Sequence, residues 1–350
     1  MKNRGKIMIL GLAVSAALIA VPQTNLYAQS ADTAPADNGF QAYVAQLGAQ
    51  ARAAGVSAAT VQAYSSALTY NLRVVALDRA QPEISPSARP PAFAPYRAAH
   101  VDADRIIRGR AIYADMATKI PEFEQKYGVP ASIILSIWGN ETSYGRVKGG
   151  FDLPNSLATL AYDGRRRALF AGEFIALLKM ADQGVPRDRM VGSWAGAFGN
   201  PQFLPSVYLR LAQDGDGDGV RDIWSNRADT MASIANYFRD SGWRPGLPWG
   251  VGAYVPADLD RSTLIGKLDS PVCKRVHSRR TRWLTVKEWR AKGVIPQGNL
   301  PDSTMAALIE PDGIGKNAYL LTGNYRVILE YNCSNYYALS VGLLADEIAK

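Results

Sequence analysis

One glutamate, Glu141, stands at the end of an apolar helical segment and is the best candidate for acid–base chemistry in this 350-residue chain. The apolar residues of 133–138 recur at the three- and four-residue steps that place side chains on one helix face, and Pro130 suits the first helical turn. At the C-terminal end of that helix, desolvation and the helix dipole both favour the protonated carboxyl. Such a group can donate a proton to a leaving group. The alternative is a solvated glutamate, the commoner environment of this residue type.

A second segment, 192–206, combines small residues with aromatic ones in a way that suits a sugar-binding surface. Gly196 and Gly199 remove side-chain bulk, so that the backbone can approach a ligand. The aromatic residues offer flat faces to sugar rings. Ser193 and Gln202 supply a hydroxyl and an amide for hydrogen bonds. Taken alone, the segment could equally be a Gly-rich connection packed by its aromatic residues.

Six segments, in a fixed order, give the chain a resemblance to the lytic murein transglycosylase B family over nearly its whole mature length. They are WGNETSYG at 138–145, LATLAYDGRRR at 157–167, GSWAGAFGNPQFLPS at 192–206, DGDGDGVRDIW at 214–224, SIANYFRDSGW at 233–243 and YNCSNYYALSVGLLAD at 331–346. The match is looser at Asn140, because an apolar residue is more usual before the glutamate.

The resemblance implies a lytic transglycosylase with a lysozyme-like helical core. Glu141 would be the catalytic acid, protonating the glycosidic oxygen between N-acetylmuramic acid and N-acetylglucosamine. As a carboxylate it would then accept the proton of the muramyl C6 hydroxyl, giving a 1,6-anhydro sugar. The residues that the resemblance places against substrate are Tyr144, Ser193, Gln202, Tyr331, Asn332 and Tyr337.

The number of carboxylates near Glu141 bears on the reaction type. Hydrolysing glycosidases commonly place two carboxylates across the bond. The rivals here are Asp152, in a Gly-rich turn, and Asp163, which the arginines of 165–167 should hold ionised and engaged. A single carboxyl acting twice is therefore favoured. A lysozyme-like peptidoglycan hydrolase and a non-catalytic cell-wall-binding module remain the alternatives.

The acidic segment that begins at Asp214 has the pattern of a calcium loop. Oxygen ligands stand at alternate positions, Gly219 takes the sharp turn, and position twelve is Ser225 where an EF-hand has a bidentate glutamate. A carboxylate of the following helix could supply the missing ligand. The candidate ligands are Asp214, Asp216, Asp218, the carbonyl of Val220, Asp222 and Asp229. We expect a bound Ca²⁺ to be structural, with no cofactor for catalysis; the alternative is an exposed acidic turn.

Residues 1–28 are expected to be a signal peptide. Lys2, Arg4 and Lys6 precede an apolar run at 7–21, and Ala28 offers a small residue for cleavage. The run is short for a membrane-spanning helix, and no cysteine stands at the junction to be acylated. We therefore expect a soluble periplasmic protein that is not a lipoprotein. A retained N-terminal anchor is the alternative.

Charge and cysteine content agree with an exported enzyme acting on an acidic polymer. The net charge is +8, and the basic residues form no long stripe. Peptidoglycan strands therefore suit the chain as partner, and nucleic acid is not expected. The cluster 165–167 is more typical of a solvated helix face than of a binding patch. Cys273 and Cys333 are expected to pair in an oxidising compartment. We expect a monomer and leave cell-wall synthesis proteins open as partners.

The fold class expected is mainly α (α+β): a lysozyme-like helical core with a small mixed insertion and an N-terminal helical region. The prolines of 82–95 should interrupt regular structure. Tyr325 to Tyr331 alternates like a strand, and 336–349 should be a helix. The expected divisions are a signal peptide at 1–28, a linker and helical region at 29–102, the catalytic core at 103–243, a small mixed α/β insertion at 244–323, and a C-terminal strand and helix at 324–350.

Overall fold

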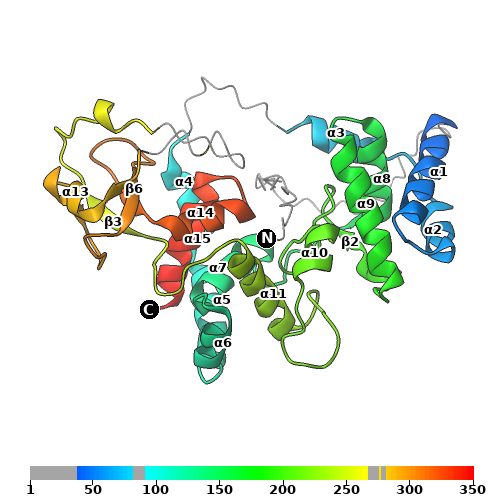
Figure 1. The fold of residues 1–350 in the computed structure, drawn as a ribbon, viewed down its shortest axis with the longest axis horizontal. Helices are drawn as coiled ribbons and strands as arrows, with labels where there is room; N and C mark the ends of the chain where they lie inside the picture. The colour runs from blue at the N-terminus through cyan, green and yellow to red at the C-terminus, as the bar shows by residue number, and fades with distance from the viewer. Residues whose placement is uncertain (1–37, 82–90, 267–275, 277–280) are drawn as a thin grey trace, which may run out of the picture. The chain divides into compact units, whose positions relative to one another are not determined.

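The computed structural model describes residues 38–81, 91–266, 276 and 281–350, which are mainly helical with short strands (Figure 1). They form two compact units. The first unit holds the described residues of 91–140 and 237–350, and the second holds 38–81 and 141–236. No described helix is long and apolar enough to cross a membrane. The predicted signal peptide lies outside the described residues.

The second unit is built around two packed helices, α8 (Leu153–Asp163) and α9 (Arg167–Asp182). The Asp152 side chain caps α8 by accepting the Asn155 N–H, and Gly164 ends this helix with a φ of 92°. Such caps satisfy backbone groups that have no partner within the helix. The unit also contains α1 (Asn38–Ala53), α2 (Ala58–Ser65), α3 (Leu72–Arg79), α10 (Pro205–Leu211), most of α11 (Arg227–Asp240) and the antiparallel pair β1 (Phe151–Asp152) and β2 (Val191–Gly192).

The arginine cluster after α8 is structural. Arg165 and Arg166 both pair with Asp78 of α3, a carboxylate that is only 1% exposed. Arg167 donates to the Tyr162 carbonyl at 3.2 Å. Arg165 and Arg167 are exposed, as expected of a solvated face, whereas Arg166 is partly buried, because the buried Asp78 carboxylate requires paired charges and hydrogen bonds around it.

The first unit combines helices with a small sheet. The C-terminal helix α15 (Asn335–Ile348) packs against α4 (Phe93–His100), α5 (Ala103–Asp115) and α14 (Gly323–Tyr331). Ser136 of α7 (Ala131–Thr142) donates to the Val341 carbonyl of α15 at 2.6 Å. The unit also includes α6 (Ile120–Tyr127), and its helical part therefore positions the start of α7, which ends at Glu141 and Thr142.

Between residues 244 and 323, the described residues form a five-stranded antiparallel sheet and include the short helix α13 (Val286–Ala291). The strand order is β4-β6-β7-β3-β5, and Trp289 of α13 anchors the core by donating its indole N–H to the Ala306 carbonyl at 3.0 Å. The strands are β3 (Gly250–Tyr254), β4 (Leu284–Thr285), β5 (Ile295–Pro296), β6 (Met305–Ile309) and β7 (Tyr319–Leu321).

Two local expectations are wrong. The predicted strand at 325–331 is the helix α14, whose start is capped by Thr322 and whose Tyr325 and Ile328 are buried three residues apart. A short apolar run fits the periodicity of a helix as well as that of a strand, so the N-cap residue Thr322 was the better signal. Pro95 lies inside α4. A proline is tolerated in the first helical turn, and there the Asp312 carboxylate accepts the N–H groups of residues 93 and 94.

The N-terminal helices and the C-terminal helix are found where the sequence predicted them. The two units divide the chain differently from the expected domains, since the cut falls within α7 and α11 and not at residues 103 and 243. Cys333 is disulfide-bonded, and Cys273 is the only other cysteine of the sequence. Because Cys273 lies outside the described residues, their pairing stays a prediction.

Candidate functional site

Glu141 is the penultimate residue of α7 and is partly exposed. The chain turns sharply after it, because Ser143 and Tyr144 have φ values of 48° and 58°. The left-handed region is uncommon for residues with a side chain, and such residues cluster at functional sites. The turn is held by Thr142, whose Oγ1 accepts the Gly145 N–H at 3.0 Å and whose carbonyl accepts a second N–H from residue 147.

The predicted sugar-binding segment, 192–206, folds back on itself in the same unit. Ser193 exchanges backbone hydrogen bonds with Ala197 and with Gly196, and its Oγ accepts the Ala197 N–H at 3.0 Å. Gln202 has a φ of 53°, and its amide donates to the Gly199 carbonyl at 2.9 Å. Among the described residues, the Ser193 hydroxyl proton and the Gln202 side-chain oxygen have no partner, so both are available to a sugar.

The structure brings these two segments together within the second unit. Thr142 Oγ1 donates to the Asn200 carbonyl at 3.3 Å. Gly149, which follows the glutamate motif, lies so close to Gly192 that a Cβ added to it would be 1.9 Å from the Gly192 carbonyl oxygen. Glu141, Tyr144, Ser193 and Gln202 therefore belong to segments that contact each other directly.

Three predicted substrate residues belong to the first unit. Tyr331 ends α14 and packs edge-on against Tyr237 at 4.8 Å. Asn332 caps that helix, and its side-chain oxygen is buried with no partner among the described residues. Tyr337 is buried in the first turn of α15. Buried acceptors usually have a hydrogen-bond partner, and among the described residues the Asn332 oxygen has none.

Both rival carboxylates are engaged in structural contacts of the second unit. Asp152 caps α8 and pairs with Arg187. Asp163 pairs with Arg79 at 2.5 Å, and Tyr70 donates to the same oxygen at 3.5 Å. Asp163 is therefore engaged as predicted, although by an arginine of α3 and not by the neighbouring cluster.

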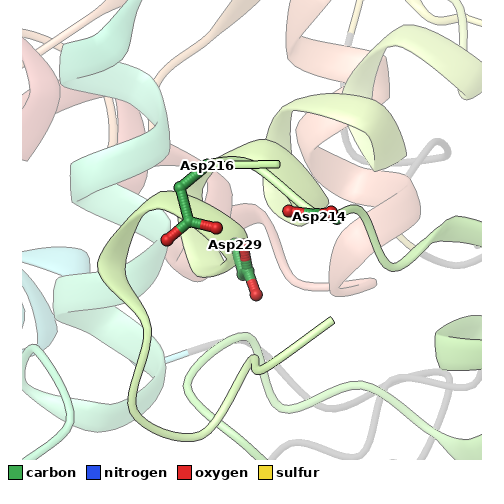
Figure 2. A group of neighbouring side chains, drawn as sticks. All are labelled: Asp214, Asp216 and Asp229. Atoms are coloured by element: carbon green, nitrogen blue, oxygen red, sulfur yellow. The ribbon is translucent and has the colours of Figure 1, made fainter. Parts of the chain in front are cut away.

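The acidic loop brings three of the predicted metal ligands together (Figure 2). One carboxylate oxygen from each of Asp214, Asp216 and Asp229 lies within 4.8 Å of the other two. Burial raises the pKa of Asp229, hydrogen bonds from two backbone N–H groups oppose it, and the charges of Asp216 and Asp214 raise it further. Carboxylate oxygens are the ligands that Ca²⁺ prefers, so this cluster fits such an ion, with Asp229 supplying the carboxylate that the EF-hand pattern lacks at Ser225.

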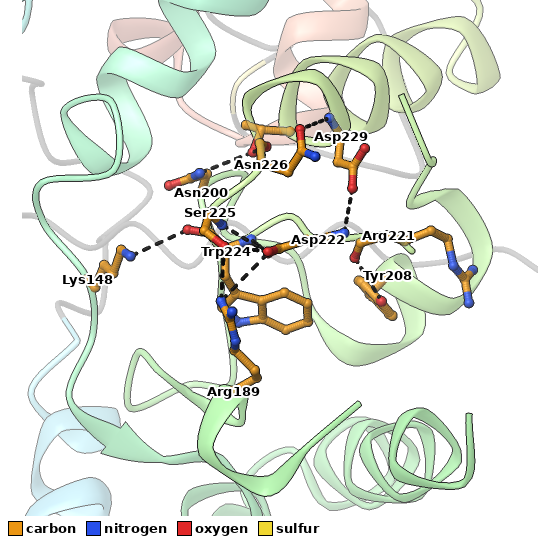
Figure 3. Close-up of polar contacts among 11 residues, drawn as sticks. Lys148, Arg189, Asn200, Tyr208, Arg221, Asp222, Trp224, Ser225, Asn226 and Asp229 are labelled. Carbon is orange, nitrogen blue, oxygen red and sulfur yellow. Dashed lines mark hydrogen bonds and ion pairs between the residues drawn. The ribbon is translucent and has the colours of Figure 1, made fainter. Parts of the chain in front are cut away.

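Two predicted ligands are directed elsewhere. Asp218, which is exposed, accepts the Val220 N–H at 2.7 Å. The Asp222 carboxylate accepts the N–H groups of Trp224 and Ser225, both at 2.9 Å, and lies 3.7 Å from Arg189 (Figure 3). The structure therefore places neither carboxylate in the acidic cluster. The Val220 residue itself is exposed at the end of the loop.

Asn200 was not among the residues predicted from the sequence. It lies in the 192–206 segment and forms hydrogen bonds with the end of α7, with the acidic loop and with α11. Its carbonyl accepts from Thr142, its N–H donates to the Ile223 carbonyl at 2.8 Å, and its amide donates to Thr230 Oγ1 at 3.1 Å. The only signal in the sequence was an asparagine between Gly199 and Pro201, which is also typical of any turn.

Comparison with known proteins agrees with this arrangement. Residues 39–346 match the family described as the Transglycosylase SLT domain. The chain is 32% identical over 272 residues, 75% of its length and 70% of the relative's, to the membrane-bound lytic murein transglycosylase B of Escherichia coli strain K12.

Solved structures of related enzymes share the fold. SltB3 from Pseudomonas aeruginosa, crystallised with NAG-anhNAM-pentapeptide, superposes with a TM-score of 0.78 at 37% identity, covering 89% of this chain and 80% of that one. The Escherichia coli lytic transglycosylase Slt35, crystallised with calcium, gives a TM-score of 0.71 at 28% identity, covering 91% and 96%. With its helical fold and the family match over most of its length, this chain belongs to the transglycosylase SLT family and is a lytic transglycosylase.

Proposed function

We propose that this enzyme cleaves the β-1,4 bond between N-acetylmuramic acid and N-acetylglucosamine in peptidoglycan strands without consuming water. The product carries a 1,6-anhydro-N-acetylmuramic acid end. The observation that carries the proposal is the setting of the carboxylates: Glu141 lies at the end of α7, directly before the strained turn beside the sugar-binding segment, while Asp152 and Asp163 are held in structural pairs.

In this reaction Glu141 acts twice. As a carboxylic acid it donates its proton to the glycosidic oxygen while the bond from that oxygen to C1 of the muramyl sugar breaks. As a carboxylate it accepts the proton of the muramyl C6 hydroxyl, whose oxygen forms the new bond to C1. The proton count returns to its starting value, so Glu141 is ready for the next bond. Ser193 and Gln202 offer hydrogen-bonding groups to hold the sugars.

A related structure supports this product chemistry. SltB3 was crystallised with NAG-anhNAM-pentapeptide, which contains an anhydro sugar. The intramolecular attack is also favoured physically, because a nucleophile that is already part of the bound substrate has a high effective concentration.

The test is the chemistry of the released fragments. Digestion of purified peptidoglycan should give muropeptides about 18 mass units lighter than those of a hydrolase, because hydrolysis adds one water per bond cut. They should take up no oxygen label from solvent and resist borohydride reduction. Reducing, solvent-labelled fragments would establish a lysozyme-like hydrolase, and a protein that binds strands and releases nothing would be a non-catalytic wall-binding module.

We also propose that Ca²⁺ binds the cluster of Asp214, Asp216 and Asp229 and stabilises the loop. A ligand that binds only the folded state stabilises it by about 2.7 kcal/mol at a hundred times its Kd. For a unit of this size that corresponds to a melting temperature higher by roughly 5–10 °C. Scanning calorimetry with calcium and with a chelator measures this rise.

Matched variants locate the ion. Asp216→Asn should abolish the rise, because it removes one of the clustered carboxylates. Asp218→Asn should keep it, because the Asp218 carboxylate accepts the Val220 N–H and lies outside the cluster. Identical melting curves with calcium and chelator for the unsubstituted protein would show that this segment is a plain acidic turn.

The proposed site of action is the periplasm, reached through cleavage of the predicted signal peptide. Peptidoglycan strands are the proposed partner, and the enzyme is proposed to act as a monomer. Calcium aside, the reaction needs no cofactor, because Glu141 supplies both proton transfers.

A further inference from the structure

Asn200 is buried, at 4% exposed, in the short turn between Phe198 and Phe203. These two phenylalanines exchange backbone hydrogen bonds of 2.9 and 3.1 Å, which fixes the base of the turn. The position of Asn200 is thus set by the sugar-binding segment. Its own polar groups reach two other parts of the second unit.

On one side, Asn200 contacts the segment that follows the catalytic acid. Its carbonyl accepts the Thr142 hydroxyl, and Thr142 is the residue next to Glu141. A Cβ added to Gly145 would lie 2.7 Å from Asn200 Oδ1, so the amide packs directly against the turn that contains Ser143 and Tyr144. A left-handed turn of this kind persists only where its surroundings hold it.

On the other side, Asn200 is fixed to the acidic loop and the helix that follows it. Its N–H donates to the Ile223 carbonyl, and its amide donates to Thr230 Oγ1, which in turn donates to the Asn226 carbonyl at 2.8 Å. Figure 3 shows Asn200 beside Asn226, the residue that precedes α11. Thr230 is fully buried, so this anchor is rigid.

One polar atom of Asn200 has no structural use. Its Oδ1 is buried and has no hydrogen-bond partner among the described residues. An unsatisfied buried acceptor costs about 1–3 kcal/mol, so an apolar residue of similar shape would serve stability better. The feature that the asparagine does provide is the link between Thr230 and the turn after Glu141.

We propose that Asn200 is a positioning residue for the transglycosylase reaction: its amide, held by Thr230, packs against the turn 143–145 and so keeps Glu141 in its reactive orientation, beside the hydrogen bond that the Asn200 main-chain carbonyl accepts from Thr142. The inference rests on the proposed role of Glu141 as the acid. Asn200 touches neither substrate nor reacting atoms in this account. It acts by fixing the end of α7 against the buried Thr230.

The first test is Asn200→Ala, assayed on a soluble peptidoglycan fragment. We expect kcat to fall about tenfold to a hundredfold with KM within about twofold, since a misplacement of roughly 1 Å can cost about 10²-fold in rate. The readout is the split between kcat and KM, because a loss of folding alone would leave the kcat of the folded fraction unchanged.

A second pair of variants tests the link without changing Asn200. Thr230→Val removes the acceptor of the Asn200 amide and should reproduce the fall in kcat, whereas Thr230→Ser keeps the hydroxyl and should behave as the unsubstituted enzyme. This pair decides the question if Asn200→Ala does not fold. Asn236→Ala is the control for stability alone: it removes another buried amide of the second unit, one that donates to the Leu211 carbonyl, and should lower the melting temperature without changing the kcat of the folded fraction.

The outcomes separate this inference from the proposed function. Unchanged kcat in Asn200→Ala and Thr230→Val, with Glu141→Gln inactive, would overturn the positioning role and leave the acid in place. An equal effect of Thr230→Val and Thr230→Ser would overturn it too. An active Glu141→Gln enzyme would remove the basis of both proposals.

Discussion

Glu141→Gln should lower the rate of muropeptide release by at least about a thousandfold while the protein stays folded. A general acid alone contributes about 10²–10⁴-fold, and here the same group also serves as the base. Glutamine keeps the shape of the side chain and removes the transferable proton. The rate of release from purified peptidoglycan, measured alongside the far-UV circular dichroism spectrum, checks both parts of the expectation.

Glu173→Gln is the matched control. Glu173 is a buried carboxyl of the same unit whose pKa burial raises, and Ser206 donates to it through both its N–H and its hydroxyl. The substitution should destabilise the protein and leave the specific activity of the folded fraction unchanged. If Glu141→Gln retained a tenth of the activity, the acid would have to be sought elsewhere.

The position of Glu141 could be predicted because its local signals agree. The apolar residues of 133–138 follow the helical period, and all of them are buried in the structure. Ser193 and Gln202 followed from a segment in which glycine and aromatic residues alternate. The periodicity of one helix and the composition of one loop are properties of neighbouring residues, so the sequence expresses them directly.

The turn after Glu141 could not be predicted in the same way. Ser143 and Tyr144 adopt left-handed conformations that their residue types do not favour, and Asn200, far along the chain, helps to hold them. The helix α4 is a similar case, because Asp312 caps it from 219 residues away. Contacts between residues so far apart in the sequence are set by the tertiary fold and not by the local sequence.

The acidic loop shows a third limit of sequence reasoning. Alternating aspartates predicted a ring of ligands that included Asp222, yet that carboxylate caps the turn at Trp224 and Ser225. Asp and Asn side chains readily bond backbone N–H groups two or three residues ahead, and spacing alone does not say which use prevails. Asp229 joins the cluster because it lies in the first turn of α11, and the sequence pattern of the loop does not specify where that helix begins.

Gly149→Ala should be among the most destabilising single substitutions in the second unit. The added Cβ would lie 1.9 Å from the Gly192 carbonyl oxygen and 2.4 Å from the Ser193 nitrogen, contacts that no native packing tolerates. Gly192 cannot retreat easily, because it pairs with Phe151 in the β1–β2 ladder and a Cβ on it would itself be 2.2 Å from the Ala197 oxygen. We expect a loss of about 4 kcal/mol in the free energy of unfolding, at the exceptional end for one substitution.

The neighbouring glycine is a control that differs by one position. A Cβ at Gly150 would meet no atom within 4 Å, so Gly150→Ala should change the free energy of unfolding by no more than about 0.5 kcal/mol. Urea unfolding of the two variants measures the difference, and the folded fraction of Gly149→Ala should also lose activity, because the Glu141 motif and the 192–206 segment would be pushed apart. Equal stabilities of the two variants would mean that the Glu141 motif and the 192–206 segment do not approach as closely as the structure has them. Gly149 would then not be the residue that holds these two segments in contact.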